Sequence, residues 1–130
     1  MRTGGRDWLF DCGSDLAYEH LVLPYLRTRG VNRLDGLLLS HGDVKHLGGA
    51  LPLLDDFHPR AIADSVLRDK SSTRKTLHAE LARRGLGKGL YARGDTLRLA
   101  PAVTVRVLYP PAGLQRATAD DKALVLQLEA

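Results

Sequence analysis

The stretch "LLLSHGDVKHLGG", residues 37–49, decides how the rest of this chain of 130 residues is interpreted. An apolar run ends at a serine, and His41, Asp43 and His46 then follow within six residues, before two glycines. The continuous apolar run predicts a buried strand, and α/β folds place their chemistry at the carboxyl ends of such strands. Imidazole nitrogens and carboxylate oxygens are ligands that zinc accepts. The stretch therefore indicates a metal site, and a polar turn at the end of a strand is the alternative.

Length and composition limit the class of protein. The 44% apolar and 26% charged content are typical of a globular chain with a core, and the length suits one domain. No apolar run approaches the roughly 18 residues that cross a bilayer, and the N-terminus lacks the apolar segment of a signal peptide. A single cysteine, Cys12, excludes an internal disulfide and a thiolate metal cluster. We expect Cys12 to be buried. The sequence assigns no cellular compartment to the protein.

The positive charge is concentrated in one segment. The formal net charge is +4, yet residues 68–98 hold nine basic side chains against three acidic ones. A patch of one sign attracts polyanions such as a nucleic-acid backbone, and the alternative is a solvated basic helix face. Tyr91 is the segment's one aromatic residue, so no base-stacking platform is predicted. The predicted nucleic-acid contacts are Arg68, Lys70, Arg74, Lys75, Arg83 and Arg84.

Strand and helix patterns alternate along the chain. Polar residues that favour helix starts and glycines that favour helix ends delimit the predicted helices, and the first helix should kink or restart at Pro24. Strands are predicted at 7–13, 34–41, 59–65, 89–111 and 122–130, and helices at 14–30, 50–57 and 71–85. Ser14 or Asp15 should cap the first helix and Ser71 or Ser72 the last. This order predicts an α/β fold, a mixed β-sheet with helices packed on it.

The same residues resemble the metallo-β-lactamase superfamily, in particular the ComEC-type competence proteins. "LLLSHGDVKHLGGALPLL" is similar to their first signature, which reads approximately Ser/Thr-His-Pro-Asp-Ala-Asp-His-Ile-Gly-Gly after an apolar strand. The segments "WLFDCG", "VLPYLRTRGVNRLDGLLLSH", "GDTLRLAPAVTVRVLYPP" and "DDKALVLQLEA" resemble the elements around that signature. The resemblance implies a partial metallo-β-lactamase-like fold, half of the αββα arrangement. It also implies one domain over 1–130, truncated at both ends.

The resemblance assigns roles to individual residues. It implies that His41, Asp43 and His46 are metal ligands, that Asp43 is also catalytic, and that Asp11 orients a ligand or the loop. The implied metal is zinc or manganese. Lys45 stands where the family has the aspartate of a second metal, and an ammonium group has no acceptor for a cation. We therefore expect the second metal position to be lost, with either a single-metal site or a site in which Lys45 pairs with Asp43.

Three functions follow from this combination. The first is metal-assisted phosphodiester hydrolysis in a domain related to ComEC DNA-uptake proteins, impaired here because a ligand is changed. The second is a non-catalytic DNA-binding module, or pseudoenzyme, with a degenerate metal site. The third is a chain without independent activity. Implied partners are DNA and the family's membrane channel segments outside this chain, which would make the protein membrane-associated, and no small-molecule partner is evident. His20, His58 and His78 are expected to be solvated rather than ligands.

Overall fold

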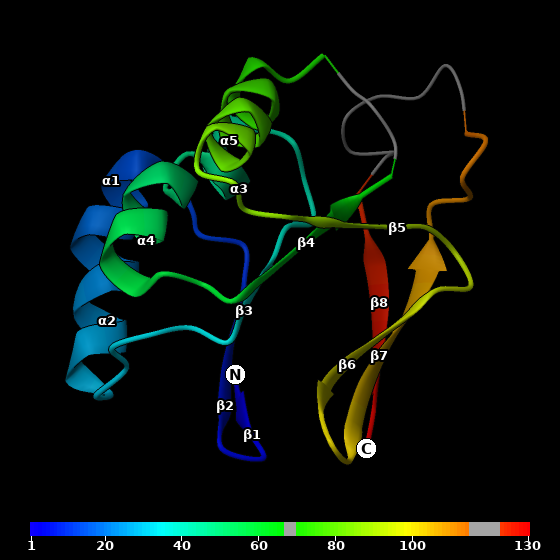
Figure 1. Cartoon of the computed structure of the whole chain (residues 1–130), viewed down its shortest axis with the longest axis horizontal. Coiled ribbons are helices and arrows are strands. Elements are labelled where there is room, and N and C mark those ends of the chain that lie inside the picture. The colour runs from blue at the N-terminus through cyan, green and yellow to red at the C-terminus, as the bar shows by residue number, and fades with distance from the viewer. Residues whose placement is uncertain (67–69, 115–122) are drawn as a thin grey trace.

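The computed structural model describes residues 1–66, 70–114 and 123–130, and its elements alternate as the sequence predicts (Figure 1). In chain order the elements are β1 (Arg2–Thr3), β2 (Arg6–Phe10), α1 (Asp15–Ala17), a π-helical segment (Tyr18–Val22), α2 (Leu23–Thr28), β3 (Gly36–Leu38), α3 (Val44–Leu47), α4 (Ala50–Phe57), β4 (Ala61–Ser65), α5 (Ser72–Arg83), β5 (Gly89–Tyr91), β6 (Thr96–Ala100), β7 (Val103–Tyr109) and β8 (Val125–Glu129). In the described part of the chain, no helix is both long and apolar enough to span a bilayer.

The strands form two sheets. The first has the order β1-β2-β3-β4-β5, with β1 antiparallel to β2 and the other neighbours parallel. The second is antiparallel, in the order β6-β7-β8. The helices lie on one side of the first sheet and the second sheet lies on the other (Figure 1). The predicted mixed sheet with helices on it is confirmed, and the hairpin segment adds a second layer.

The central strand explains the apolar run of the deciding stretch. Leu37 and Leu39 pack into the core under the helices, whereas Leu38 packs with Val107 and Leu124 of the second layer. Successive side chains of a strand point to opposite faces. A strand that is covered on both faces therefore needs apolar residues throughout rather than alternation.

Trp8 connects the two layers. Its indole Nε1 donates a hydrogen bond of 3.0 Å to the carbonyl oxygen of Leu99 in β6. Its ring also lies over Gly36, where an added Cβ would come within 2.2 Å of ring carbons. Gly36 is therefore required by close packing, since any side chain there would displace the indole.

The ends of the helices follow their capping residues. The hydroxyl of Ser14 accepts from the amide of Ala17 at 3.1 Å and so begins α1. The helix predicted at 14–30 is interrupted by the π-helical segment, and α2 begins directly after it with Pro24 in its first turn. Gly30 follows α2 with a φ of 73°, the left-handed conformation that glycine adopts freely.

The parallel register determines which polar residues meet. Phe10 and Leu38, the last residues of β2 and β3, lie side by side, and Leu38 pairs with Ala63 two residues before the end of β4. The residues that follow them in the chain therefore emerge at one edge of the first sheet, and among them are Asp11 and Asp64.

Candidate metal centre

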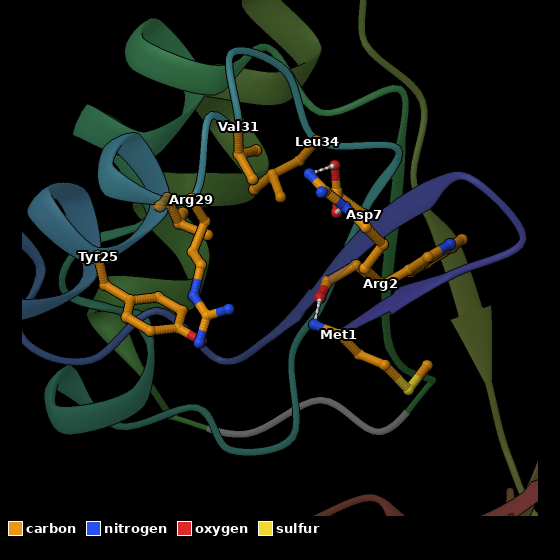
Figure 2. Close-up of a pocket in the computed structure, with 9 residues that line it drawn as sticks. Met1, Arg2, Asp7, Tyr25, Arg29, Val31 and Leu34 are labelled. Atoms are coloured by element: carbon orange, nitrogen blue, oxygen red, sulfur yellow. Dashed lines mark hydrogen bonds and ion pairs between the residues drawn. The ribbon is translucent and has the colours of Figure 1, made fainter.

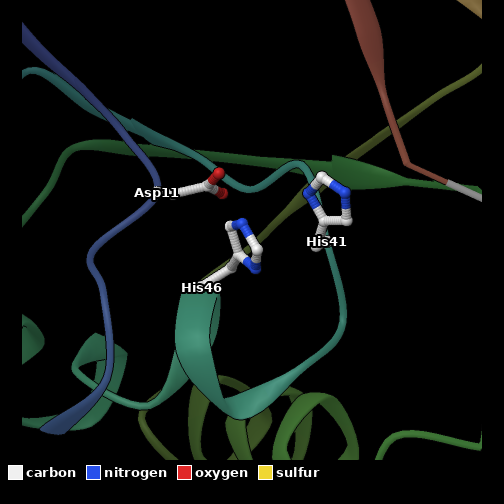
Figure 3. Close-up of side chains that lie close together, drawn as sticks. All are labelled: Asp11, His41 and His46. Carbon is white, nitrogen blue, oxygen red and sulfur yellow. The ribbon is translucent and has the colours of Figure 1, made fainter. Parts of the chain in front are cut away.

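Three side chains converge at this edge. Asp11 follows β2, His41 lies in the loop after β3, and His46 lies on α3; Figure 3 shows the three pointing toward one another. One ligand atom from each lies within 4.8 Å of the other two. The two imidazole rings are stacked, with centroids 4.2 Å apart and planes inclined by 21°. These three residues are called the donor cluster below.

Ser40 determines which nitrogen of His41 carries the proton. The Ser40 hydroxyl donates to Oδ2 of Asp11 at 2.5 Å and lies 2.8 Å from Nδ1 of His41. A hydroxyl has one proton, so once this is given to Asp11 the oxygen must accept from Nδ1–H. The Nε2 of His41 then keeps its lone pair, as a metal ligand requires.

Asp43 plays the same part for His46. Its Oδ1 lies 2.5 Å from Nδ1 of His46 and also accepts from the His46 amide at 3.1 Å, which caps α3. An ionised carboxylate only accepts, so Nδ1 donates and Nε2 is left with a lone pair. Partial burial acts to raise the pKa of Asp43, but the hydrogen bonds from the ring and the amide of His46 outweigh it, and the pKa is lowered. This carboxylate–histidine pairing is typical of metal sites.

The backbone of Asp11 is held firmly. Its φ of 59° lies in the left-handed region, which aspartate tolerates better than most residues. Its amide donates to the carbonyl of Leu38 at 2.8 Å, and its Oδ1 accepts from the amide of Ser40 at 2.7 Å. Asp11 therefore has the contacts expected of a residue that orients the loop, and it also faces both imidazoles.

The donor cluster suits a divalent metal. Two imidazole nitrogens and one carboxylate oxygen are the ligand types of catalytic zinc sites with three protein ligands, and manganese accepts them too. Asp43 lies against His46 rather than within the donor cluster, so its role as a direct ligand stays a prediction. The side chains of His46 and Asp43 are 34% and 38% exposed, which leaves the site open to solvent.

Lys45 is exposed beside this site on α3. Within residues 1–66, 70–114 and 123–130, the ion pair of Asp43 is with His46 and not with Lys45. The proposed pairing of Lys45 with Asp43 is thus not the arrangement seen.

The residues of the predicted nucleic-acid surface differ widely in exposure. Lys70 and Lys75 are exposed, whereas Arg83 and Arg84 both hydrogen-bond to Glu80, and Arg84 also pairs with Asp55 at 2.8 Å. Arg68 lies outside the described residues.

Arg74, which was predicted to contact nucleic acid, is buried, and His78, which was predicted to be solvated, is partly buried. Arg74 is only 5% exposed and its Nε lies 3.0 Å from Oδ2 of Asp64, and the same oxygen is 2.8 Å from Nε2 of His78. Asp64 is fully buried, and a buried carboxylate needs such partners. The aspartate inside the apolar stretch "AIADS" is the sequence signal for this network, which the charge of the basic segment alone does not predict. His58 is exposed, as expected.

Cys12 lies beneath the site. Its side chain is fully buried, as predicted, and its thiol donates to the carbonyl of His46 at 3.2 Å. Burial, with a smaller contribution from the charge of Asp11, raises the pKa of the thiol to about 12. The thiol therefore stays protonated, which does not suit a nucleophile.

A separate pocket of about 220 Å³ lies near the amino ends of β2 and β3 (Figure 2). Its lining includes Trp8, Leu34 and Tyr25, with the guanidinium of Arg29 over the Tyr25 ring at 5.2 Å from the centroid. No residue of the donor cluster lines it, so the pocket and the candidate metal centre are distinct.

Comparison with known families identifies the superfamily of this chain. The profile of the Metallo-beta-lactamase superfamily matches residues 1–119, and the chain therefore belongs to this superfamily. Two curated relatives are competence proteins. Competence protein ComA of Neisseria gonorrhoeae is 47% identical over 49 residues, which are 38% of this chain and 7% of that protein. ComE operon protein 3 of Bacillus subtilis (strain 168) is 30% identical over 112 residues, which are 85% of this chain and 14% of that protein.

Solved structures agree on the fold. A metallo-β-lactamase of Cronobacter sakazakii with a HARLDQ motif superposes with a TM-score of 0.62 at 17% identity, over 97% of this chain and 46% of that one. Rubredoxin oxygen:oxidoreductase of Desulfovibrio gigas gives a TM-score of 0.59 at 21% identity, over 78% of this chain and 24% of that one. The chain thus spans about half of the lactamase structure and a small part of its curated relatives.

Proposed function

We propose that this chain forms part of a metal-dependent phosphodiesterase domain in a DNA-uptake protein, with one metal position in use. The donor cluster is the observation that carries this proposal, because it joins two oriented imidazoles and a carboxylate at the carboxyl edge of the first sheet. The kinship with competence proteins supports DNA as the substrate.

Each residue of the site has a proposed part. Asp11, His41 and His46 hold the metal, which when bound supplies a Lewis acid that polarises a phosphate and lowers the pKa of water. Ser40 and Asp43 fix the imidazole tautomers. Asp43 is also the proposed catalytic base, because its carboxylate stays ionised beside the donor cluster and can accept a proton.

Lys45 limits the site to one metal in this proposal. Its ammonium repels a second dication. The rate of hydrolysis should therefore be lower than at a two-metal site. The exposed Lys70 precedes Ser71, whose hydroxyl contacts the loop at Gly42. Lys70 therefore lies near the donor cluster and can attract a phosphate backbone.

The first test is calorimetry with Zn²⁺ and Mn²⁺ on the wild type and on His41→Ala. We expect one equivalent to bind to the wild type and none to His41→Ala, whereas unchanged binding in the variant would contradict the site. Hydrolysis of single-stranded DNA with and without the metal then tests the reaction.

A second candidate is a DNA-binding module that does not cut, and Lys45 together with the exposed Lys70 and Lys75 favours it. Such a module would bind DNA equally well in the presence of a chelator, and its affinity would fall steeply with salt. Replacing Lys70 and Lys75 by alanine should make the salt dependence shallower, whereas Lys88→Ala is a matched control on an exposed residue away from the donor cluster.

A further inference from the structure

The first residue before α5 touches the loop that carries His41. The hydroxyl of Ser71 accepts from the amide of Arg74 at 3.0 Å, which caps α5. The same hydroxyl donates to the carbonyl oxygen of Gly42. Gly42 is buried between His41 and Asp43, so one hydroxyl both starts a helix of 12 residues and holds the middle of the loop.

The helix itself is anchored one strand away. Asp64, at the end of β4, contacts both Arg74 and His78, which lie four positions apart and therefore on the same face of α5. Its other oxygen accepts from the amide of Ser65 at 2.7 Å. Because Asp64 is fully buried, these contacts fix the first half of α5 against the sheet.

We propose that α5 is a positioning element for the metal site and that Ser71 is its positioning residue. The proposal rests on the proposed metal-binding function. The buried network of Asp64 holds α5 in place, and the hydrogen bond from Ser71 to Gly42 attaches the loop to this fixed helix. The ligand His41 and the supporting Asp43, on either side of Gly42, are thereby kept in their orientation.

The expected consequence is a loss of metal affinity without loss of any ligand. Residues that support ligands typically contribute roughly 10–100-fold to metal affinity. Ser71→Ala removes the donor to Gly42 and should raise the Kd for Zn²⁺ by a factor in this range, on the order of 10-fold or more. Ser71→Thr keeps the hydroxyl and should restore an affinity close to that of the wild type.

Ser14 offers a matched control. It caps α1 through the amide of Ala17, as Ser71 caps α5 through that of Arg74, so Ser14→Ala removes an equivalent cap. Within the described residues, the hydrogen bond of its hydroxyl is with the amide of Ala17 and not with residues 40–43. We expect Ser14→Ala to lower stability as much as Ser71→Ala while leaving the Zn²⁺ affinity unchanged. Equal affinities in the two alanine variants would overturn the proposal.

Amide hydrogen exchange of the metal-free protein gives a second measurement. The amides of His46 and Leu47 both donate to Asp43, and they should lose protection in Ser71→Ala but not in Ser14→Ala. If the wild type binds no Zn²⁺, the proposed function fails, yet this comparison still decides the positioning role. If Ser71→Ala does not fold, Ser71→Gly removes the same donor while glycine remains acceptable at an N-cap. Unchanged protection in either variant contradicts the proposal.

Discussion

Asp43 accepts two hydrogen bonds from His46, one from the ring at 2.5 Å and one from the amide at 3.1 Å. The same carboxylate therefore starts α3 and sets the tautomer of a proposed ligand. Asp11, which lies far from it in the chain, takes the place beside both imidazoles. We therefore expect substitutions of the two carboxylates to affect metal binding differently.

We predict that Asp11→Asn and Asp43→Asn differ in their effect on metal binding. Loss of a ligand should abolish detectable Zn²⁺ uptake in Asp11→Asn. Asp43→Asn should weaken it by roughly 10–100-fold, the usual effect of a residue that orients a ligand. Calorimetry of the two variants in parallel gives the comparison, and the reverse order would identify Asp43 as the direct ligand.

The second prediction concerns Lys45. Lys45→Asp replaces a cation with an oxygen ligand next to His46, and we expect the Mn²⁺ stoichiometry to rise or the affinity to increase by about 10-fold. Lys75→Asp is the matched control, because it makes the same charge change on the exposed face of α5. An equal gain in both variants would show that only the overall charge matters.

The third prediction concerns alkaline stability. Burial, together with the hydrogen bond of 2.6 Å to Asp56, raises the pKa of Tyr18 above its ordinary value of 10.0. The raised pKa means that the folded protein keeps a proton that the unfolded chain loses, so the free energy of unfolding falls as the pH rises above about 10. Denaturant unfolding at several alkaline pH values should show that the free energy of unfolding declines less steeply with pH in Tyr18→Phe than in the wild type. Tyr25→Phe, at a tyrosine that is 58% exposed, should decline like the wild type.

A fourth prediction compares a buried ion pair with an exposed one. Asp64→Ala leaves the buried Arg74 without its carboxylate and should lower the free energy of unfolding by about 3–5 kcal/mol. Asp7→Ala breaks the ion pair with Arg2, whose side chain is 59% exposed, and should lower the free energy of unfolding far less, because water screens an exposed pair. Urea unfolding measures both, and similar losses would argue against a structural role for the network of Asp64.

The sequence predicted the parts of the fold that depend on local patterns. The run at residues 37–39 has no polar position, so only a strand covered on both sides fits it, and Ser71 and Gly30 have the side chain and the flexibility that helix ends need. These features require no knowledge of distant residues. The location of His41 just after a buried strand follows from the same reasoning, whereas His46 lies on the short helix α3.

Features that depend on register between distant strands were harder to predict. Asp11 meets the histidines because β2 lies parallel to β3 with Phe10 opposite Leu38, and no local pattern shows that alignment. Arg74 looked like one more cation in a basic segment, since its partner Asp64 lies on another element. The buried aspartate in "AIADS" was the available signal, because an ionised group inside an apolar strand implies a cation or donor nearby.

The position of Trp8 makes the chain its own optical probe. It is the single tryptophan, it is buried, and its indole bonds to Leu99 across the two layers. Its emission should therefore shift to longer wavelength when the second layer separates from the first and water reaches the ring. Loosening of the loop around His41, which follows β3, should leave the emission spectrum unchanged, because the bond from Trp8 to Leu99 does not involve that loop. Fluorescence and metal titration together can thus distinguish loss of the site from loss of the fold without any added label.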